Sequence, residues 1–544
     1  MRLLKSFYGK PKDHQIRIVN EIDDALKNGY NDIILCAPTG TGKSYIAICL
    51  ALAYGSSSIL TATVDLQDQY MRDFPFVKTI KGKKNFNCLK IANKKITCDN
   101  ISSSLCYNKN KGFCEFYPNQ KDFRVDKKGI DEKIIYDGEN IQLCEYYKQK
   151  FEAILSSHTI FNYHEYLSLL KFTNQAPYRS IMVCDEAHLL ENRLVEFYGY
   201  SITKRLLATA KMELPSSNIY EIDTWLALLN ELKDRYSSML NDMSNNLTNA
   251  GINELIRLNE EMSKVEANME RIEFIYDEIS SNTSNYVVNI ERDNDNLSKV
   301  TLLPIDISKY TKELFSMSKV RLFMSATIDD DIFPKSLAIN NAKFISIDSP
   351  FPVENRRVYF LESYSLNKDN IKREEVIKKV AQSIDTIMNN HKNERGLILV
   401  TSYALALAIK DRVREKKRII VSNEIKREEV INALKSSSNS VMISPSLWDG
   451  IDLKDDLCRF IIIAKAPYLD LNDRRIAVKM RSDKEWYLLQ SAMRLIQGCG
   501  RGVRHDKDYC KIYVLDKNAT KLIKDVENKI PEWFRNACVF QHKI

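Results

Sequence analysis

The sequence predicts an α/β protein whose two main domains are each built on a parallel sheet. Near the N-terminus, the apolar residues 33–36 lead into a glycine-rich turn and then into the start of a helix. The apolar residues 181–184 end in two adjacent acids, as strands of parallel sheets do where they meet a ligand. From about Phe344 onward, apolar strand segments alternate with helical segments, which predicts the second domain.

Length and composition narrow the class of protein. A chain of 544 residues exceeds one hydrophobic core, so we expect three or four domains or large insertions. The net charge of +8 is mild and permits a nucleic-acid partner without arguing for one. With no apolar run of signal-peptide or membrane-span length, we expect no membrane partner and a cytoplasmic location in a prokaryotic or viral host, or a nuclear one in a eukaryote. Clustered cysteines in such reducing compartments indicate metal ligands or catalytic groups.

Residues 37–44 read APTGTGKS and fit a P-loop, with alanine where many P-loops have their first glycine. Glycines let backbone N–H groups curl around the phosphates of ATP. Lys43 would neutralise the outer phosphates, and Ser44 would hold Mg²⁺. The alternative is a chance loop, which the preceding strand and following helix disfavour. The expected nucleotide contacts are Ala37, Pro38, Thr39, Gly40, Thr41, Gly42, Lys43 and Ser44.

The sequence DEAH follows the apolar residues 181–184. Asp185 would hold Mg²⁺, and Glu186 would orient or deprotonate the water that attacks the terminal phosphate. His188 is a candidate coupling residue. Four letters alone say little, but after a P-loop they predict ATP hydrolysis.

The sequence QGCGRGVR, residues 497–504, also suggests a mechanism. Gln497, Arg501 and Arg504 would share one face if the segment were helical. Its three glycines would then disfavour the helix, and close approach to another domain is a candidate reason for them. Two arginines presented across a cleft suit stabilisation of charge during phosphoryl transfer. The alternative is a solvated basic turn.

These motifs resemble those of superfamily 2 nucleic-acid translocases, and the rest of the chain resembles the XPD and DinG helicases. TATVDLQDQ (61–69), MSATI (324–328) and SPFPVENRRVYF (349–360) are similar to family segments, and QGCGRGVR resembles motif VI. LWDGIDL (447–453) resembles motif V and adds Gly450 and Asp452 to the expected nucleotide contacts, although Asp449 stands where glutamate is commoner. GKPKDHQ (9–15) resembles a nucleotide-side motif, in which Gln15 would contact adenine or simply start a helix.

The resemblance implies an ATP- and Mg²⁺-dependent DNA helicase that moves 5′ to 3′ along single-stranded DNA. It implies two RecA-like motor domains, at residues 1–343 and 344–544. The first would carry an iron–sulfur insertion at 78–146 and a helical arch insertion at 196–312. Because one chain supplies both motor domains, we expect a monomer; the sequence names no protein partners.

Five of the twelve cysteines lie between residues 88 and 144. Nine, seven, seven and twenty-nine residues separate them, which is too loose for zinc ribbons and fits an iron–sulfur cluster better. The resemblance implies a [4Fe–4S] cluster on four of them. It favours Cys88, Cys106, Cys114 and Cys144 as ligands, with Cys98 as the alternative to Cys106.

The same region is basic, with nine lysines and one acid from Lys78 to Lys111 and interleaved aromatic residues. Such a surface suits phosphate contact and base stacking, although a solvated basic loop has the same composition. The family has this domain where duplex is split, which implies a forked-DNA partner. FNYHEYL (161–167) resembles a segment near the DNA path, with Asn162 and Tyr163 as candidate contacts.

Apolar residues at helical spacing between Pro215 and Pro304 predict two long antiparallel helices joined at 245–251. This insertion falls where the family has its arch, although a scaffolding bundle has the same spacing. Two other functions remain open. One is a cluster-free DEAH-type RNA helicase or remodelling ATPase, and the other is a cluster-bearing nucleic-acid binding protein whose ATPase is a switch.

Overall fold

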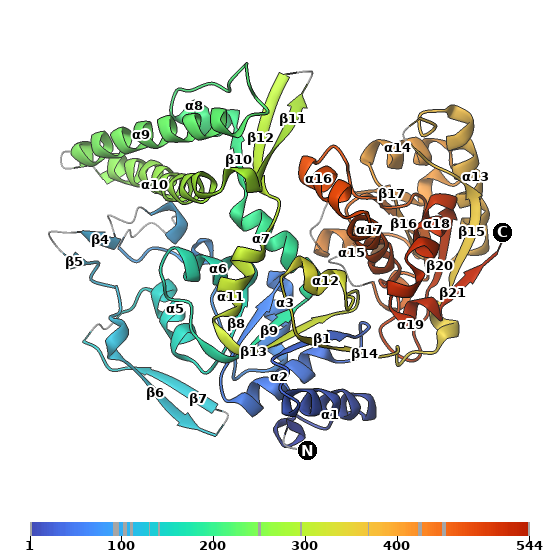
Figure 1. Cartoon of the computed structure of the whole chain (residues 1–544), viewed down its shortest axis with the longest axis horizontal. Coiled ribbons are helices and arrows are strands. Elements are labelled where there is room, and N and C mark those ends of the chain that lie inside the picture. Colours follow the sequence, from blue (N-terminus) through green and yellow to red (C-terminus); the bar gives the residue numbers. More distant parts are fainter. Residues whose placement is uncertain are drawn as a thin grey trace.

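The computed structural model describes residues 3–90, 97–101, 106–108, 112–129, 131–139, 142–247, 252–293, 296–367, 369–422, 427–448 and 453–541. Within these ranges the chain forms two seven-stranded parallel sheets, which confirms the predicted α/β class. Figure 1 shows the two sheet domains side by side, with a long helical pair above the first. None of the described helices is both long and apolar enough to cross a membrane.

The first sheet has the strand order β14-β1-β13-β9-β2-β8-β3. Its strands are β1 (Asp32–Cys36), β2 (Ser57–Thr61), β3 (Lys78–Thr79), β8 (His158–Asn162), β9 (Arg179–Asp185), β13 (Ser318–Ser325) and β14 (Ala342–Ser346). Cys36 at the end of β1 pairs with Ser325 of β13, and Met324 of β13 pairs with Asp185 of β9. Because parallel strands end at one edge, the P-loop, the SAT sequence and the DEAH sequence meet there.

Helices cover both faces of this sheet (Figure 1), and the central strands β1 and β2 are accordingly buried almost throughout. On α1, the residues Ile18, Val19 and Ile22 form the buried stripe of an amphipathic helix. The helices around this sheet are α1 (Asp13–Lys27), α2 (Lys43–Tyr54), α3 (Val64–Asp73), α5 (Glu145–Leu155), α6 (Tyr163–Lys171), α7 (Leu190–Tyr198), α11 (Ser308–Phe315) and α12 (Ile332–Ser336).

The segment between β3 and α5 folds into short elements. They are η3 (Cys98–Asn100), β4 (Tyr107–Asn108), β5 (Gly112–Phe113), β6 (Phe123–Lys128) and β7 (Asp131–Tyr136). The hairpin of β6 and β7 projects from the body of the domain (Figure 1). Aromatic contacts hold its base, where the ring of Phe123 lies 4.9 Å from Tyr136 and 5.9 Å from Phe151.

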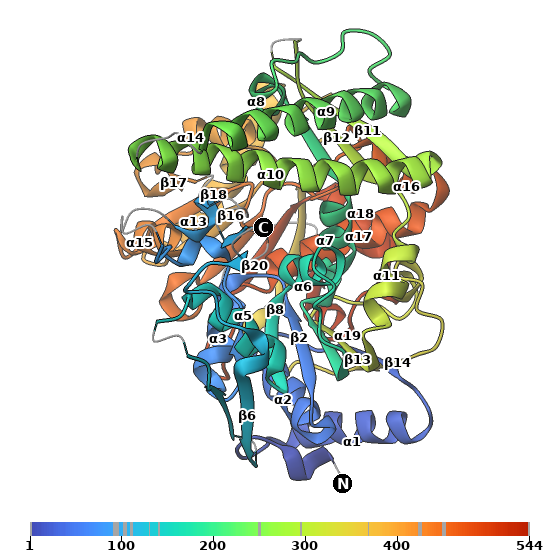
Figure 2. The same cartoon turned by 90° about the vertical axis from the view of Figure 1, so that its left-hand side faces the viewer.

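The predicted long helices are α9 (Ile222–Leu247) and α10 (Ile252–Ser281), which run side by side across the molecule (Figure 2). Trp225, Leu229 and Tyr236 of α9 and Ile272 of α10 are buried in a core of their own. The predicted joining turn lies mostly at 248–251, outside the described residues. A three-stranded antiparallel sheet closes the base, and the sequence analysis did not predict it. Its strands are β10 (Tyr200–Thr203), β11 (Tyr286–Asp293) and β12 (Asn296–Pro304), and helix α8 (Lys204–Thr209) follows β10.

The second sheet has the order β17-β18-β16-β19-β20-β15-β21. Its strands are β15 (Val358–Tyr364), β16 (Gly396–Leu399), β17 (Ile419–Val421), β18 (Val441–Ser444), β19 (Phe460–Ile463), β20 (Lys511–Asp516) and β21 (Cys538–Phe540). Its helices are α13 (Glu374–Asn390), α14 (Tyr403–Arg412), α15 (Arg427–Lys435), α16 (Arg474–Ser482), α17 (Lys484–Cys499), α18 (Lys517–Asp525) and α19 (Glu532–Arg535).

Two of the predicted boundaries need correction. The division between residues 343 and 344 falls inside β14, all of which pairs with β1 in the first sheet. The start of the insertion at residue 78 falls on β3, which pairs with β8 in the same sheet. Both strands are short and lie at the two edges of the sheet, where sequence alone gives a weak signal.

Candidate active site

The P-loop curls around the start of α2 in a conformation that requires glycine. Gly40 and Gly42 have φ angles of 81° and 78°, which side chains disfavour. A Cβ atom on Gly42 would lie 2.3 Å from Nε2 of Gln15, and one on Gly40 would lie 2.4 Å from the ring of Phe351. The backbone therefore forms a narrow cradle at the N-terminus of α2, which fits a phosphate group.

Lysine and hydroxyl groups of this loop bond to its own carbonyls. Lys43 Nζ donates to the carbonyls of Ala37 (3.0 Å) and Pro38 (3.4 Å). The hydroxyl of buried Thr41 donates to the carbonyl of Pro38 at 2.8 Å. Ser44 stands in the first turn of α2, beside Lys43. This is the set of groups that phosphate and Mg²⁺ recognition needs.

Gln15 joins the start of α1 to the P-loop. Its Oε1 accepts from the Lys12 backbone N–H at 2.9 Å, and its Nε2 donates to the Thr41 carbonyl at 3.2 Å. The side chain is 5% exposed. In this structure Gln15 therefore caps the helix and braces the P-loop; a contact with adenine remains a prediction.

Asp185 lies at the end of β9, and both oxygens of its carboxylate accept a hydrogen bond. Its Oδ1 accepts from the Glu186 backbone N–H at 2.9 Å, and its Oδ2 accepts from the hydroxyl of Tyr70 at 2.8 Å. Burial, and next the charge of Glu186, raise the pKa of Asp185 to about 6, while Lys43 acts in the opposite direction. A buried carboxylate near a lysine fits a divalent cation, which would hold it ionised.

Glu186 has an unusual backbone for a residue with a side chain, with φ 49° and ψ 48°. Non-glycine residues in this left-handed region concentrate at functional sites. The side chain is 33% exposed, and its carboxylate lies 3.3 Å from Nδ1 of His188. Glu186 is thus presented to solvent next to Asp185, as the activation of a water molecule requires.

A chain of hydrogen bonds leads from the acid pair into the second domain. The His188 Nδ1 atom lies 2.8 Å from Oγ of Ser325, and that Oγ accepts from the Thr327 backbone N–H at 3.1 Å. Gln497 Nε2 of α17 then donates to Oγ1 of Thr327 at 2.8 Å. The DEAH, SAT and QGCGRGVR segments are therefore joined by hydrogen bonds, and a coupling role for His188 stays a prediction.

The segment is not helical as far as the two arginines, so the condition under which they would share a face with Gln497 is not met. Helix α17 ends at Cys499, and both arginines follow it in a turn. Arg504 Nη1 donates to Oγ1 of Thr39 in the P-loop at 2.7 Å, across the domain boundary. Arg501 Nη2 donates to the Trp448 carbonyl at 2.7 Å within its own domain.

The glycines of this segment make close contacts, but within their own domain. A Cβ atom on Gly498 would lie 2.8 Å from Leu399, and one on Gly502 would lie 2.4 Å from Cys510. The predicted close approach to another domain is made by the Arg504 backbone and not by these glycines, since a Cβ atom on Gly40 of the P-loop would lie 3.2 Å from the Arg504 carbonyl oxygen. Two other predicted contacts, Gly450 and Asp452, lie outside the described residues.

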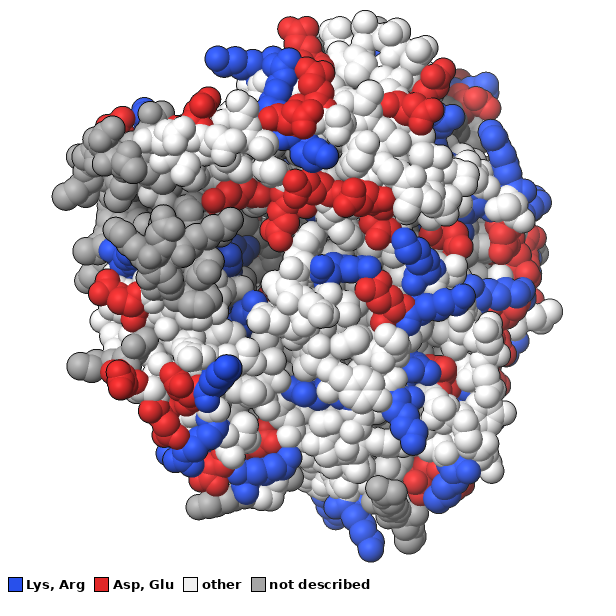
Figure 3. All heavy atoms as spheres, turned by 60° about the vertical axis from the view of Figure 1, so that its left-hand side comes forward, with Lys and Arg blue, Asp and Glu red and all other residues white. Residues whose placement is uncertain are grey.

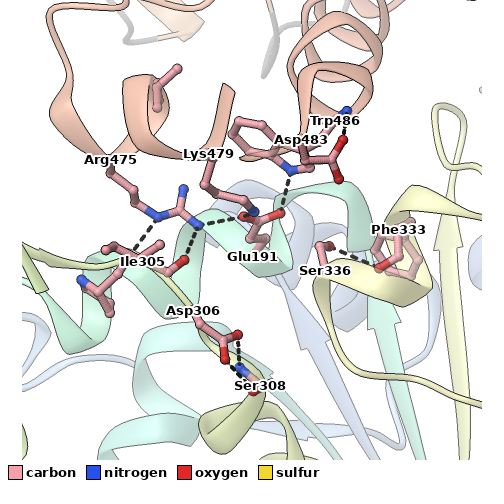
Figure 4. Close-up of polar contacts among 12 residues, drawn as sticks. Glu191, Ile305, Asp306, Ser308, Phe333, Ser336, Arg475, Lys479, Asp483 and Trp486 are labelled. Carbon is pink, nitrogen blue, oxygen red and sulfur yellow. Dashed lines mark hydrogen bonds and ion pairs between the residues drawn. The ribbon is translucent and has the colours of Figure 1, made fainter. Parts of the chain in front are cut away.

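Glu191 was missed by sequence reasoning and lies between the two domains, facing Arg475, Lys479 and Trp486 (Figure 4). It stands on α7, just after the DEAH sequence, and its Oε1 pairs with Arg475 (2.6 Å) and Lys479 (2.5 Å) of α16. Its Oε2 accepts from Nε1 of Trp486 on α17 at 3.2 Å. Burial alone would raise the pKa of Glu191, but Lys479 and Arg475 lower it to about 2. No local motif signals this residue, because its partners lie far along the chain.

All five clustered cysteines line one small cavity, together with Phe116, Tyr117 and Tyr147. Cys98 and Cys144 share a hydrogen bond, which favours the thiolate of Cys144 and raises the pKa of Cys98. Cys106 lies close enough to be affected by the charges of Cys88, Cys114 and Cys144. A set of convergent thiols walled by aromatic rings fits an iron–sulfur cluster. The structure brings Cys98 to the cavity as well as Cys106.

The surface around the lysine-rich residues 78–111 carries acidic as well as basic side chains (Figure 3). Several of its lysines lie outside the described residues, and Figure 3 shows both charges on this side of the molecule, including a row of acidic side chains. On α10, Glu266 and Glu273 raise the pKa of Glu270 in addition to burial, while Lys83 acts to lower it. Helix α10 also touches the cysteine-rich insertion, where Ser263 Oγ donates to the Asp99 carbonyl at 3.0 Å.

The two predicted DNA contacts near residue 162 have structural roles here. Asn162 caps α6 by accepting from the Glu165 backbone N–H at 2.7 Å. Tyr163 is 1% exposed, so its prediction as a DNA contact is wrong. Its hydroxyl donates instead to the backbone carbonyl of Asp185 at 3.0 Å.

Comparisons with known proteins agree with this arrangement. Residues 8–214 match the family described as "Type III restriction enzyme, res subunit", and residues 384–537 match "Helicase C-terminal domain". A relative named ATP-dependent DNA helicase YoaA, from Haemophilus influenzae, is 20% identical over 93% of this chain and 91% of its own length. One named ATP-dependent DNA helicase XPD, from Sulfolobus acidocaldarius, is 20% identical over 94% of this chain and 97% of its own length.

Solved structures share the fold over the whole chain. A structure described as an XPD helicase has a TM-score of 0.65 at 16% identity and covers 98% of this chain and 100% of its own. The structure of Xpd4 from S. tokodaii has a TM-score of 0.57 at 16% identity, covering 97% and 100%.

The P-loop, the acid pair and the arginine turn, placed between two parallel-sheet domains, define a superfamily 2 protein with two RecA-like domains. Within that class, the chain is similar over most of its length to proteins named ATP-dependent DNA helicase YoaA and XPD.

Proposed function

We propose that this protein is an ATP-dependent DNA helicase that moves 5′ to 3′ along single-stranded DNA and carries a [4Fe–4S] cluster where the strands separate. The observation that carries the proposal is the contact of Arg504 with Thr39 across the domain boundary. It brings an arginine of one domain to the phosphate cradle of the other, as hydrolysis at a domain interface requires.

The residues suggest how the site works. Lys43 and the P-loop backbone would hold the phosphates, Ser44 and Asp185 would hold Mg²⁺, and Glu186 would orient the attacking water. Bound Mg²⁺ supplies charge neutralisation between the phosphates. Arg501 and Arg504 would stabilise the charge that develops on the transferred phosphoryl group, with Gln497 positioning their turn. Closing and opening the cleft in each cycle would move the grip on the DNA strand.

The cysteine cavity supports the second part of the proposal. Cys88, Cys106, Cys114 and Cys144 would hold the cluster. When bound, the cluster cross-links loops that are far apart in sequence and stabilises the insertion. The contact of this insertion with α10 supports a passage for one DNA strand between them. We expect single-stranded and forked DNA as partners of a monomer.

Replacing Lys43 by alanine tests the motor. We expect ATP hydrolysis and fork unwinding to fall at least about a hundredfold, because the phosphates lose their countercharge, while binding of single-stranded DNA changes less than about threefold. The substitution Lys521→Ala, at an exposed position on α18, is the matched control. The substrates are DNA forks with one 5′ or one 3′ tail, and the same forks in RNA.

The outcomes separate the alternatives. Unwinding of only the 5′-tailed DNA fork supports the proposal, and unwinding of only the 3′-tailed fork contradicts the direction. Activity on RNA forks alone would establish an RNA helicase. A Lys43→Ala variant that unwinds normally would show that ATP hydrolysis is not the motor.

A further inference from the structure

Two buried tyrosines, Tyr70 of α3 and Tyr163 of α6, donate hydrogen bonds to Asp185 of the DEAH sequence. The hydroxyl of Tyr70 donates to Oδ2 of Asp185 at 2.8 Å, and the hydroxyl of Tyr163 donates to its backbone carbonyl at 3.0 Å. Tyr70 is 0% exposed and Tyr163 is 1% exposed. Both side chain and backbone of the predicted Mg²⁺ ligand are therefore fixed by hydroxyl groups that no nucleotide motif contains.

The tyrosines belong to two helices whose other parts reach the surface. On α3, Gln67 and Tyr70 face inward, while Asp65 and Asp68 are exposed. Tyr163 is the first residue of α6. A displacement of either helix would therefore move a hydroxyl group that is bonded to Asp185.

Helix α3 is joined to the lysine-rich segment by an ion pair, and the charge of Lys83 also acts on Glu165 of α6. Asp68 of α3 pairs with Lys81 at 3.0 Å, and both side chains are partly exposed. On α6, burial raises the pKa of Glu165, while Lys150 and Lys83 act to lower it. Phosphates of a nucleic acid that bind Lys81 and Lys83 would compete with these acids and release their hold on α3 and α6.

We infer that Tyr70 and Tyr163 are positioning residues that transmit binding of single-stranded DNA at the lysine-rich segment to Asp185. This inference rests on the proposed function. Tyr70 fixes the orientation of the carboxylate, since Oδ1 is already held by the Glu186 backbone N–H. Movement of α3 would change how Asp185 meets the cation, and so would link DNA occupancy to hydrolysis.

The test compares Tyr70→Phe and Tyr163→Phe with a matched control. Tyr166→Phe also removes a buried tyrosine hydroxyl from α6, but one that donates to the Pro177 carbonyl. Two quantities are measured for each protein. The first is equilibrium binding of a fluorescent ADP analogue as Mg²⁺ is varied, and the second is kcat and KM for ATP with and without oligo(dT). Thermal unfolding of each variant confirms that it folds.

For Tyr70→Phe we expect half-saturation at about tenfold higher Mg²⁺, the size of effect expected from one hydrogen bond to a charged group. We also expect it to lose most of the DNA stimulation of kcat, with little change in KM. Tyr163→Phe should lose DNA stimulation with a smaller effect on Mg²⁺. Tyr166→Phe should match the unchanged protein in both measurements.

Two outcomes would overturn the inference, and they are distinguishable. Suppose that DNA stimulates the kcat of the unchanged protein and stimulates the kcat of Tyr70→Phe and Tyr163→Phe to the same extent. The tyrosines then do not couple DNA binding to hydrolysis, and the proposed function stands. If DNA does not stimulate the unchanged protein at all, the coupling and the DNA-dependent motor fail together.

Discussion

At the scale of single residues, Arg504 connects the second domain to the P-loop of the first. Its guanidinium donates to Thr39 in the other domain and also to the Gly500 carbonyl of its own turn. Arginine suits this position because its planar fork serves several acceptors at once, whereas lysine presents a compact point charge. The side chain thus connects a fixed turn to the phosphate cradle.

The substitution Arg504→Lys should lower kcat for ATP at least about a hundredfold and leave KM within about threefold. The reason is that an arginine which stabilises the transition state acts mainly on the chemical step. Steady-state ATP hydrolysis is the measurement. Arg205→Lys, at an exposed position on α8, is the control for the same chemical change. A large rise in KM at unchanged kcat would assign Arg504 to nucleotide binding instead.

At the scale of elements, α7, α16 and α17 are joined by one buried carboxylate. The Glu191 side chain is 8% exposed, and those of Arg475 and Lys479 are 5% and 16% exposed. Arg475 also donates through Nε to the Pro304 carbonyl at 2.9 Å, which ties the end of β12 to the same point. The helix that follows the acid pair and the helix that leads to the arginine turn are thus anchored at one place.

Replacing Glu191 by glutamine should lower the free energy of unfolding by about 3 kcal/mol, because it leaves two buried cations without their countercharge. The measurement is urea unfolding at pH 7. The control is Glu231→Gln, which breaks the exposed pair with Arg235 at 2.6 Å and should cost less than about 1 kcal/mol. Equal effects of the two substitutions would show that the buried network is no stronger than a surface pair.

The low pKa of Glu191 determines how the difference in free energy of unfolding between the unchanged protein and Glu191→Gln depends on pH. A carboxyl group whose folded pKa is lowered to about 2 stabilises the fold fully above its ordinary pKa of 4.5. Its contribution is lost as the pH falls from 4.5 toward 2. Urea unfolding at pH 7, 6 and 5 should therefore give the same gap between the unchanged protein and Glu191→Gln. A gap that shrinks between pH 7 and 5 would contradict the assignment.

At the scale of the whole molecule, the cysteine cavity lies between the first sheet domain and helix α10. Cys144 precedes α5, whose neighbours belong to the first sheet domain, and Cys98 begins η3, next to the Asp99 carbonyl that Ser263 of α10 contacts. A metal group in this cavity would therefore stabilise more than its own loops. Such a group would add to the aromatic contacts of Phe123 with Tyr136 and Phe151, which hold the base of the hairpin.

Protein purified without oxygen should contain four irons and four sulfides per chain. Cys114→Ser and Cys106→Ser should lose them, and limited proteolysis should then cut within 78–146 before it cuts the motor domains. Cys98→Ser is the comparison and should keep its iron, because the family resemblance favours Cys106 over Cys98 as the fourth ligand, although both line the cavity. Iron loss in Cys98→Ser but not in Cys106→Ser would show that Cys98, and not Cys106, is a cluster ligand. Zinc in place of iron would contradict the proposal of an iron–sulfur cluster.

The sequence by itself determined the local parts of this protein. The P-loop, the DEAH strand end and the spacing of α9 and α10 follow from short-range rules, because glycine torsions and helical period depend only on neighbouring residues. The sheet of β10, β11 and β12 was missed because the stronger helical pattern around it masks three strands whose partners are distant in sequence.

Only the tertiary structure decided which distant residues meet. Tyr70 and Asp185 are 115 residues apart, and Glu191 and Lys479 are 288 residues apart. The end of α17 at Cys499 likewise frees Arg504 to turn toward Thr39, which the glycine pattern alone did not reveal. These contacts depend on strand register and helix packing across two domains, so no local stretch of sequence encodes them.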